Sequence, residues 1–196
     1  MTYLFDIGNV LLSFDFIPAL NSLKGENPAP NAVDEIIHHK DAFEAGELLL
    51  PEYLILVREL LDYSGSDHDF FTTWNSIFTP IQETFKLAKT LKNQGHRLIL
   101  FSNINPIHAP FCLKEYKLSE IFDHYVFSYE INAIKPNNAF FTRAFEKFQI
   151  NPEDTIYIDD LPENIAAGKR FGLRSFCYDY NKHDELLLWL DSQENQ

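Results

Sequence analysis

The sequence has little cysteine, little glycine and a shortage of positive charge. Its 196 residues include 2 cysteines, 7 glycines, and 16 Lys and Arg against 29 Asp and Glu, for a formal net charge of −13. Cys112 and Cys177 lie far apart in apolar stretches, so we expect both to pack in the core, without a disulfide framework, in a reducing compartment. The negative field repels phosphate backbones and anionic membrane surfaces, so we expect neither nucleic acid nor a membrane as a partner.

Long apolar runs are also absent, and none has the length that a bilayer crossing requires. The first apolar stretch is interrupted by Asp6 and Asp15, and no Lys or Arg precedes Lys24, which is unlike a signal peptide. We therefore expect a cytoplasmic protein, either a monomer or a homodimer. With 45% hydrophobic and 15% aromatic residues, the chain can build one sizeable core.

Strand and helix patterns alternate along most of the chain. Short apolar runs rich in β-branched and aromatic residues predict buried parallel strands at 2–6, 97–101, 124–128, 155–159 and 174–178. Helices are predicted from Pro80 to Gly95, from Pro136 onward, and over 161–172 and 182–190. The pattern predicts an α/β fold with crossover helices and a frayed end over 192–196.

The segment between Val10 and Pro80 breaks this alternation, because its pattern is helical throughout with no convincing strand. Helices are predicted at 16–23, 32–44, 51–63 and 67–78, separated by short loops. We expect an inserted four-helix cap over residues 14–79, and a core built from residues 1–13 and 80–196.

Three polar residues stand where predicted strands end: Asp6, Ser102 and Asp160. The carboxyl ends of neighbouring parallel strands face a common crevice, so these side chains can converge. A carboxylate such as Asp6 can attack phosphorus and form an aspartyl-phosphate, which divides hydrolysis into two easier steps. Taken alone, an acid after a strand is equally well explained as a turn former or helix cap.

Groups suited to phosphate follow the middle strands. Ser102 can offer its hydroxyl, and it and Asn103 can offer backbone N–H groups, to phosphate oxygens. Lys135 would neutralise a phosphoryl group and keep Asp6 ionised. Individually, a Ser-Asn pair is more often a helix cap and a Lys before a Pro is normally on the surface.

An acidic pair, Asp159 and Asp160, closes the strand predicted at 155–159. Two adjacent acids at a strand end repel each other unless positive charge balances them. We expect Mg²⁺ to supply this positive charge, because it prefers oxygen ligands and is the usual metal ion of phosphoryl-transfer enzymes. Acids capping a surface helix are the alternative explanation.

These four motifs, in this order and with a helical insertion after the first, resemble those of haloacid dehalogenase superfamily phosphatases over nearly the whole chain. The FDIGNVL stretch, Asp15, the SNINPIH stretch and the Lys135-Pro136 pair look most like the bacterial α-D-glucose 1-phosphate phosphatase group. The resemblance implies a Rossmann-like three-layer core under a four-helix cap, and a Mg²⁺-dependent cytoplasmic phosphatase. Its expected substrate is a small phosphorylated metabolite, a sugar 1-phosphate in that group.

The resemblance also assigns roles to individual residues. It makes Asp6 the nucleophile and a metal ligand, and Lys135 a catalytic and phosphate-binding residue beside Ser102 and Asn103. The other implied metal ligands are Asp160 and the backbone carbonyl of Gly8. Asp159 and Asn164 are expected to assist by positioning or through metal-bound water.

Gly8 departs from the wider family pattern, in which a second Asp at this position acts as general acid and then base. Such help is worth roughly 10²–10⁴ in rate, so a primary-alcohol phosphate is expected to be a poor substrate and an anomeric 1-phosphate a better one. The glucose 1-phosphate phosphatase group also lacks this second Asp. Asp15 is a candidate replacement acid, although a solvated hinge residue explains it as well. Gly8 is also explained by a turn needing positive φ or a close backbone approach.

Two other functions remain open. The 2-haloacid dehalogenase branch also lacks the second acid, but it needs a cap cation for the halide, and no Arg precedes Arg58. A non-catalytic phosphosugar-binding protein could keep the fold, but binding alone does not require Asp6.

Several further side chains are candidates to face the crevice. His108 lies just past the phosphate loop, although we expect it on a helix surface. Cap residues that could select the leaving group are Phe43, Glu44, Trp74 and Asn75, although aromatic residues at helical spacing are usually core.

Overall fold

The computed structural model describes residues 1–194. Its main sheet has five parallel strands in the order β5-β4-β1-β6-β7. Their bounds are β1 Thr2–Phe5, β4 Arg97–Ser102, β5 His124–Phe127, β6 Thr155–Asp159 and β7 Arg174–Cys177. Each predicted strand is confirmed to within one residue. The α/β prediction is therefore correct.

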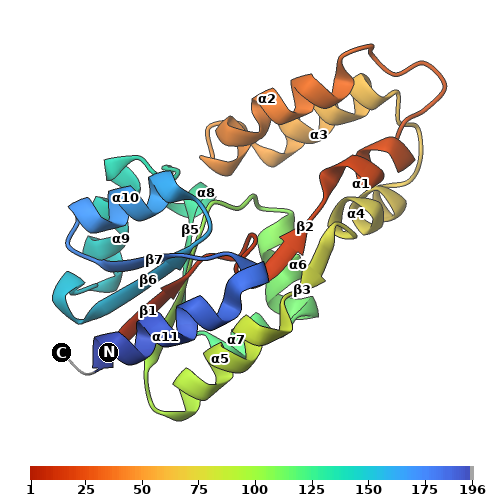
Figure 1. Cartoon of the computed structure of the whole chain (residues 1–196). Helices are drawn as coiled ribbons and strands as arrows, with labels where there is room; N and C mark the ends of the chain where they lie inside the picture. Colours follow the sequence, from red (N-terminus) through yellow and green to blue (C-terminus); the bar gives the residue numbers. More distant parts are fainter. Residues whose placement is uncertain (195–196) are drawn as a thin grey trace.

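Helices cover both faces of the sheet (Figure 1). One face packs against α5 Gln82–Asn93, α6 His108–Glu115, α7 Leu118–Ile121 and α11 His183–Glu194. The other packs against α8 Ser128–Ile131, α9 Asn138–Phe148 and α10 Pro162–Arg170. Along β1, Tyr3 and Phe5 face the first layer and Leu4 the second, as the period-two alternation of a strand requires. The result is a three-layer core.

Two helix starts differ from the prediction by two residues. Pro80 is the last residue of a short strand, and α5 begins at Gln82. α9 begins at Asn138, because the Asn137 side chain accepts a hydrogen bond from the Ala139 N–H and caps the helix. The patterns of the short helices α6, α7 and α8 were not recognised in the sequence.

The chain end and one cysteine also differ from expectation. The structure has Ser192 and Gln193 in α11, so the predicted fraying is wrong there, and residues 195–196 lie outside the described part. Cys112 is buried as expected, but Cys177 is exposed because β7 is an edge strand. Within residues 1–194, no helix combines the length and apolarity needed to cross a membrane.

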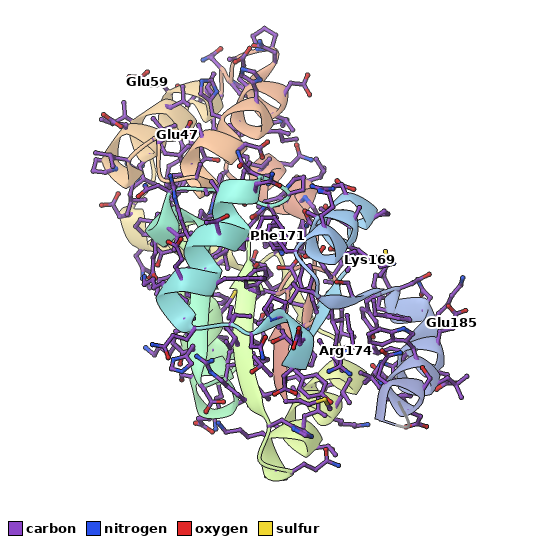
Figure 2. All side chains as sticks on the ribbon, turned by 90° about the vertical axis from the view of Figure 1, so that its left-hand side faces the viewer. Glu47, Glu59, Lys169, Phe171, Arg174 and Glu185 are labelled. Atoms are coloured by element: carbon purple, nitrogen blue, oxygen red, sulfur yellow. The ribbon has the colours of Figure 1, made fainter. Side chains whose placement is uncertain are left out.

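Helices α1 Phe16–Ser22, α2 Ala32–Glu44, α3 Leu50–Leu61 and α4 Asp67–Asn75 pack around an apolar cluster of their own. We call these helices the cap. In Figure 1 they lie at the upper right, apart from the sheet. Figure 2 shows Glu47 and Glu59 on this unit, and Arg174 and Glu185 on the core.

A two-stranded antiparallel ribbon, β2 Leu12–Phe14 and β3 Phe78–Pro80, joins the cap to the core. The prediction that no strand occurs between Val10 and Pro80 is therefore wrong. Three-residue strands whose partners are remote in sequence leave no local periodicity to detect. The expected cap boundaries, residues 14 and 79, fall inside this ribbon.

The cap also touches the core where α2 ends. Gly46 follows α2 with a φ of +71°, and a Cβ there would lie 2.7 Å from the carbonyl oxygen of Tyr129 on α8. Only glycine accommodates both the positive φ and this close approach. The end of α2 is thereby held close against the core.

Candidate active site

A cavity of about 190 Å³ lies between the cap and the carboxyl ends of β1, β4 and β6. Its walls come from the loops after these strands, the β2–β3 ribbon, α2 and α6. Of the residues predicted from sequence, it brings together Asp6, Gly8, Ser102, Asn103, Lys135, Asp160 and Asn164. Asp159 lies buried beside them, whereas Asp15 does not line the cavity.

Asp6 directly follows β1 and is 7% exposed. Its backbone N–H donates to the Ile158 carbonyl (3.0 Å), and its Oδ1 accepts from the Ile7 N–H (2.8 Å). Burial raises the pKa of Asp6 to about 7; Lys135 lowers it, and Asp159 raises it further. The protein's own groups therefore leave the negative charge at this carboxylate only partly compensated.

Lys135 supplies the positive charge of the site. Its Nζ lies 3.2 Å from Asp6 Oδ1 and 2.5 Å from Asp159 Oδ2, and it donates to the Phe101 carbonyl (2.7 Å). Burial lowers the pKa of Lys135, but the two carboxylates outweigh burial and raise it. A Lys-Pro pair that in isolation suggests a surface residue is thus a buried ammonium in contact with both acids.

Asp159 accepts hydrogen bonds from groups on every side. Besides Lys135, the donors are the Tyr157 hydroxyl (2.5 Å), the Leu161 N–H (2.9 Å) and the Asn164 amide (2.9 Å). Burial raises the pKa of Asp159, but Lys135 and these donors outweigh it and lower the pKa. Asp159 is therefore an ionised anchor that fixes Lys135, and Tyr157 is a partner that sequence reasoning missed.

Asp160 faces the cavity and is oriented by Asn9, another residue that was missed. The Asn9 amide donates to Asp160 Oδ2 (3.0 Å), and Asn9 has a φ of +50°. Asparagine tolerates this left-handed conformation better than most residues, which is the sequence signal that an Asn after Gly8 offers. Burial raises the pKa of Asp160, and its hydrogen bond from Asn9 lowers it.

The side chains around this point fit a magnesium ion. Carboxylate oxygens of Asp6, Asp159 and Asp160 lie within 4.8 Å of one another. Asn164 Oδ1 is buried and has no hydrogen-bond partner within residues 1–194. Carboxylate and amide oxygens are the ligands that Mg²⁺ prefers, directly or through water. The acidic cluster and the unpartnered oxygen thus both suit a hard cation.

Ser102 and Asn103 lie at the end of β4, but only the Ser102 side chain can contact a ligand in the cavity. The Asn103 amide donates to the Lys135 carbonyl (3.0 Å), and its oxygen accepts from the Lys135 N–H (2.8 Å). Its side chain therefore positions the lysine loop, and only its backbone N–H remains for an anion. Ser102 lines the cavity beside Asp6, and its hydroxyl lowers the pKa of that carboxyl.

The space beside Gly8 is occupied by an aromatic ring. A Cβ at Gly8 would lie 2.9 Å from Cε1 of Phe14, and the φ of Gly8 is not positive. The turn thus does not demand glycine, but a side chain at position 8 would have to displace the exposed ring of Phe14. Asp15 accepts from the Ile17 N–H (3.0 Å) as the N-cap of α1 and is exposed, so it is placed as a hinge residue and not as an acid in the cavity.

His108 lines the cavity and is 3% exposed, so its expected place on a helix surface is wrong. Its Nδ1 lies 2.9 Å from the Asn105 amide nitrogen, and its Nε2 lies 3.3 Å from the Trp74 carbonyl oxygen. Burial lowers the pKa of His108 to about 4. The first turn of α6 is covered by the cap, and the local sequence does not reveal such covering.

The cap contributes one ion pair to the cavity, between Lys40 and Glu44. Lys40 Nζ lies 2.8 Å from Glu44 Oε2 on the same face of α2. Lys40 was missed, although its spacing of four residues from an acid is a recognisable helix-pair signal. The other proposed cap residues, Phe43, Trp74 and Asn75, are buried and do not line the cavity.

The structure is thus a parallel α/β sheet with carboxylates after adjacent strands and a helical cap above them. The chain belongs to the haloacid dehalogenase-like hydrolase family, whose model matches residues 1–172. The expected superfamily is therefore confirmed.

Two curated relatives are similar in sequence. A glyceraldehyde 3-phosphate phosphatase from Pyrococcus furiosus is 28% identical over 116 residues, which are 57% of this chain and 48% of that protein. A D-ribitol-5-phosphate phosphatase from Bacteroides thetaiotaomicron is 24% identical over 184 residues, 88% of each chain. The matched region spans about half the length of the first relative and most of the second.

A solved structure of a family enzyme from Bacteroides thetaiotaomicron, an Asp-to-Ala mutant in complex with magnesium and inorganic phosphate, is similar in fold. The TM-score is 0.80 at 23% identity, covering 92% of this chain and 95% of that chain. The two proteins therefore share their fold over most of both chains.

Proposed function

We propose that the protein is a magnesium-dependent phosphatase that hydrolyses a small phosphorylated metabolite through an aspartyl-phosphate on Asp6. The observation that carries this proposal is the contact of Lys135 with both Asp6 and Asp159 beside the Asp160 carboxylate, which lines the same cavity. A nucleophile, a fixed positive charge and a metal-ligand carboxylate then face one cavity. These are the groups that phosphoryl transfer to a carboxylate requires.

Each residue has a definite task in this reaction. Asp6 attacks phosphorus and carries the phosphoryl group, while the Ser102 hydroxyl and the Asn103 N–H bind its oxygens. Lys135 neutralises charge on the transferring group and favours the ionised form of Asp6, because it lowers the pKa of that carboxyl. Mg²⁺, held by Asp6, Asp160 and the Gly8 carbonyl, would neutralise charge on the phosphoryl oxygens. Asp159 and Asn164 position these ligands.

A small phosphorylated sugar or polyol is the substrate class that the comparisons support. The two curated relatives are named for phosphate esters of this size. The likeness of the FDIGNVL and SNINPIH stretches to glucose 1-phosphate phosphatases narrows the proposal to a sugar 1-phosphate. An anomeric leaving group needs less protonation, which suits a site with Gly8 in place of the usual acid.

The dehalogenase alternative has less support from the site. No arginine lines the cavity within residues 1–194, and its lysines, Lys40 and Lys135, are both paired with carboxylates. The carboxylate of Asp160, oriented by Asn9, has a use in a metal-dependent reaction and none in halide displacement.

The direct test is a release assay for inorganic phosphate with Asp6→Asn. We expect turnover of sugar phosphates in Mg²⁺, silence in excess chelator, and loss of at least about 10⁴-fold in Asp6→Asn, because an amide cannot form the acyl-phosphate. Asp15→Asn is the matched control, since it removes an exposed acid and should keep near-normal turnover. Normal turnover by folded Asp6→Asn would refute the mechanism, and full activity in chelator would favour the dehalogenase branch.

A further inference from the structure

The missing acid at Gly8 leaves open which group protonates the leaving oxygen. Phe14 fills the space where an acidic side chain at position 8 would stand, and Asp15 is committed to capping α1. Within residues 1–194, the carboxyl groups that line the cavity are those of Asp6, Asp160 and Glu44. Asp6 and Asp160 have the nucleophile and metal tasks, so Glu44 is the one carboxyl without a role.

The histidine of the cavity is not available for proton transfer. Asn105 Oδ1 accepts from the backbone N–H groups of Ile107 and His108, so its amide donates to His108 Nδ1. His108 Nε2 therefore carries the proton and donates it to the Trp74 carbonyl. Both ring nitrogens are engaged in the structure.

We propose that Glu44 is the proton donor to the leaving-group oxygen, a role that rests on the proposed phosphatase function. Glu44 lies in the last turn of α2, on the cap side of the cavity opposite the phosphate-binding groups of the core. A leaving group bound beyond the phosphate would lie in the part of the cavity that Glu44 lines. The close contact of Gly46 with Tyr129 holds this turn against the core, and Phe43 stacks on Tyr53 with 3.9 Å between ring centroids.

The surroundings of Glu44 favour uptake of a proton. Glu44 is 6% exposed. Burial raises its pKa, Lys40 and Lys135 lower it, Asp41 raises it, and the net shift is upward. The nearby Tyr53 hydroxyl is neutral, because burial and the charge of Glu44 raise the pKa of Tyr53 well above its usual range. A bound phosphate dianion adds negative charge to the cavity and raises the pKa of Glu44 again.

The proton returns to Glu44 within one turnover. In the first step a bond forms between Asp6 and phosphorus, the bond from phosphorus to the leaving oxygen breaks, and the Glu44 proton passes to that oxygen. In the second step water attacks phosphorus, the bond to Asp6 breaks, and the Glu44 carboxylate takes the proton from water. The sum is ester plus water giving alcohol plus phosphate.

The test compares Glu44→Gln with wild type on p-nitrophenyl, phenyl and ethyl phosphates. None of these leaving groups carries a hydroxyl, so a lost substrate hydrogen bond cannot imitate the effect. We expect kcat/KM to fall by about 10²–10⁴ for ethyl phosphate, whose leaving group is most basic, and by much less for p-nitrophenyl phosphate. Glu59→Gln, which removes an exposed acid from α3 of the cap, should leave the leaving-group dependence unchanged.

The ratio of kcat/KM between two esters does not depend on the fraction of folded protein, so a loss of folded protein cannot change it. Glu44→Asp keeps a carboxyl group and should recover part of the activity on ethyl phosphate that Glu44→Gln loses. An equal loss for all three esters would overturn the role of Glu44. If wild type hydrolysed none of them in Mg²⁺, the phosphatase proposal itself would fail. These two failures are distinct, because the second appears before any variant is made.

Discussion

The Nζ atom of Lys135 lies 2.5 Å from Oδ2 of Asp159, and both side chains are completely removed from solvent. This pair joins the loop after α8 to the end of β6, and the same ammonium reaches Asp6 after β1. The site is thus held together by one cation shared between two carboxylates. Its stability and its chemistry depend on the same contact.

Lys135→Met should be strongly destabilising, because it leaves buried carboxylates without their cation. We expect the free energy of unfolding in urea to fall by about 3–5 kcal/mol. The control is Lys92→Met, which breaks the partly exposed ion pair with Asp123 and should cost about 1 kcal/mol or less. Equal costs for the two variants would mean that the buried pair contributes no more than a surface pair.

Magnesium should stabilise the wild-type protein against unfolding. At a concentration 100 times the dissociation constant the gain is about 2.7 kcal/mol, which thermal unfolding detects readily. Asp160→Asn should lose this gain. Without metal it should be no less stable than wild type near pH 7, because a carboxyl whose pKa is raised by burial opposes folding once ionised. Glu59→Gln removes an exposed cap charge and should respond to magnesium as wild type does.

An acidic side chain at position 8 should function only if the Phe14 ring no longer occupies the space beside Gly8. Gly8→Asp alone forces the Phe14 ring to move, and we expect a loss of about 1–3 kcal/mol in stability and lower kcat/KM on all substrates. In a Glu44→Gln background, which lacks the donor proposed on the cap, Gly8→Asp combined with Phe14→Ala should raise activity on sugar 6-phosphates more than on 1-phosphates, relative to Phe14→Ala in the same background. The ratio of kcat/KM for paired esters measures this, with Phe14→Ala as the control. An unchanged ratio in the double variant would contradict the leaving-group argument.

His108 should make the protein less stable in acid. Its pKa is about 4 in the folded state against an ordinary 6.5, so the unfolded chain binds a proton first as the pH falls. The stability that neutral His108 contributes above pH 6.5 is therefore lost progressively as the pH falls toward 4. The free energy of unfolding should decrease by about 2 kcal/mol between pH 7 and pH 5. His108→Gln should lack this part of the pH dependence in urea unfolding. The exposed His68, changed to Gln, should keep it.

The strands were predictable because their signal is local. Runs such as Leu98 to Phe101 are apolar on both faces, as strands buried between helix layers must be, and the polar residues that follow them mark the edge where a site forms. The cap helices were predictable for the same reason, since apolar spacing along one helix reports its buried face. Asp6, Ser102 and Asp160 could therefore be placed at one edge from sequence alone.

The sequence by itself determined the order of elements, the residues at the strand ends and the family. Only the tertiary structure decided that Lys135 is buried between two carboxylates, that Phe14 occupies the space beside Gly8, and that His108 and Glu44 face the cavity. Each of these facts depends on contacts between segments that are remote along the chain. Periodicity reports which face of an element is buried, but packing between elements decides what that face meets.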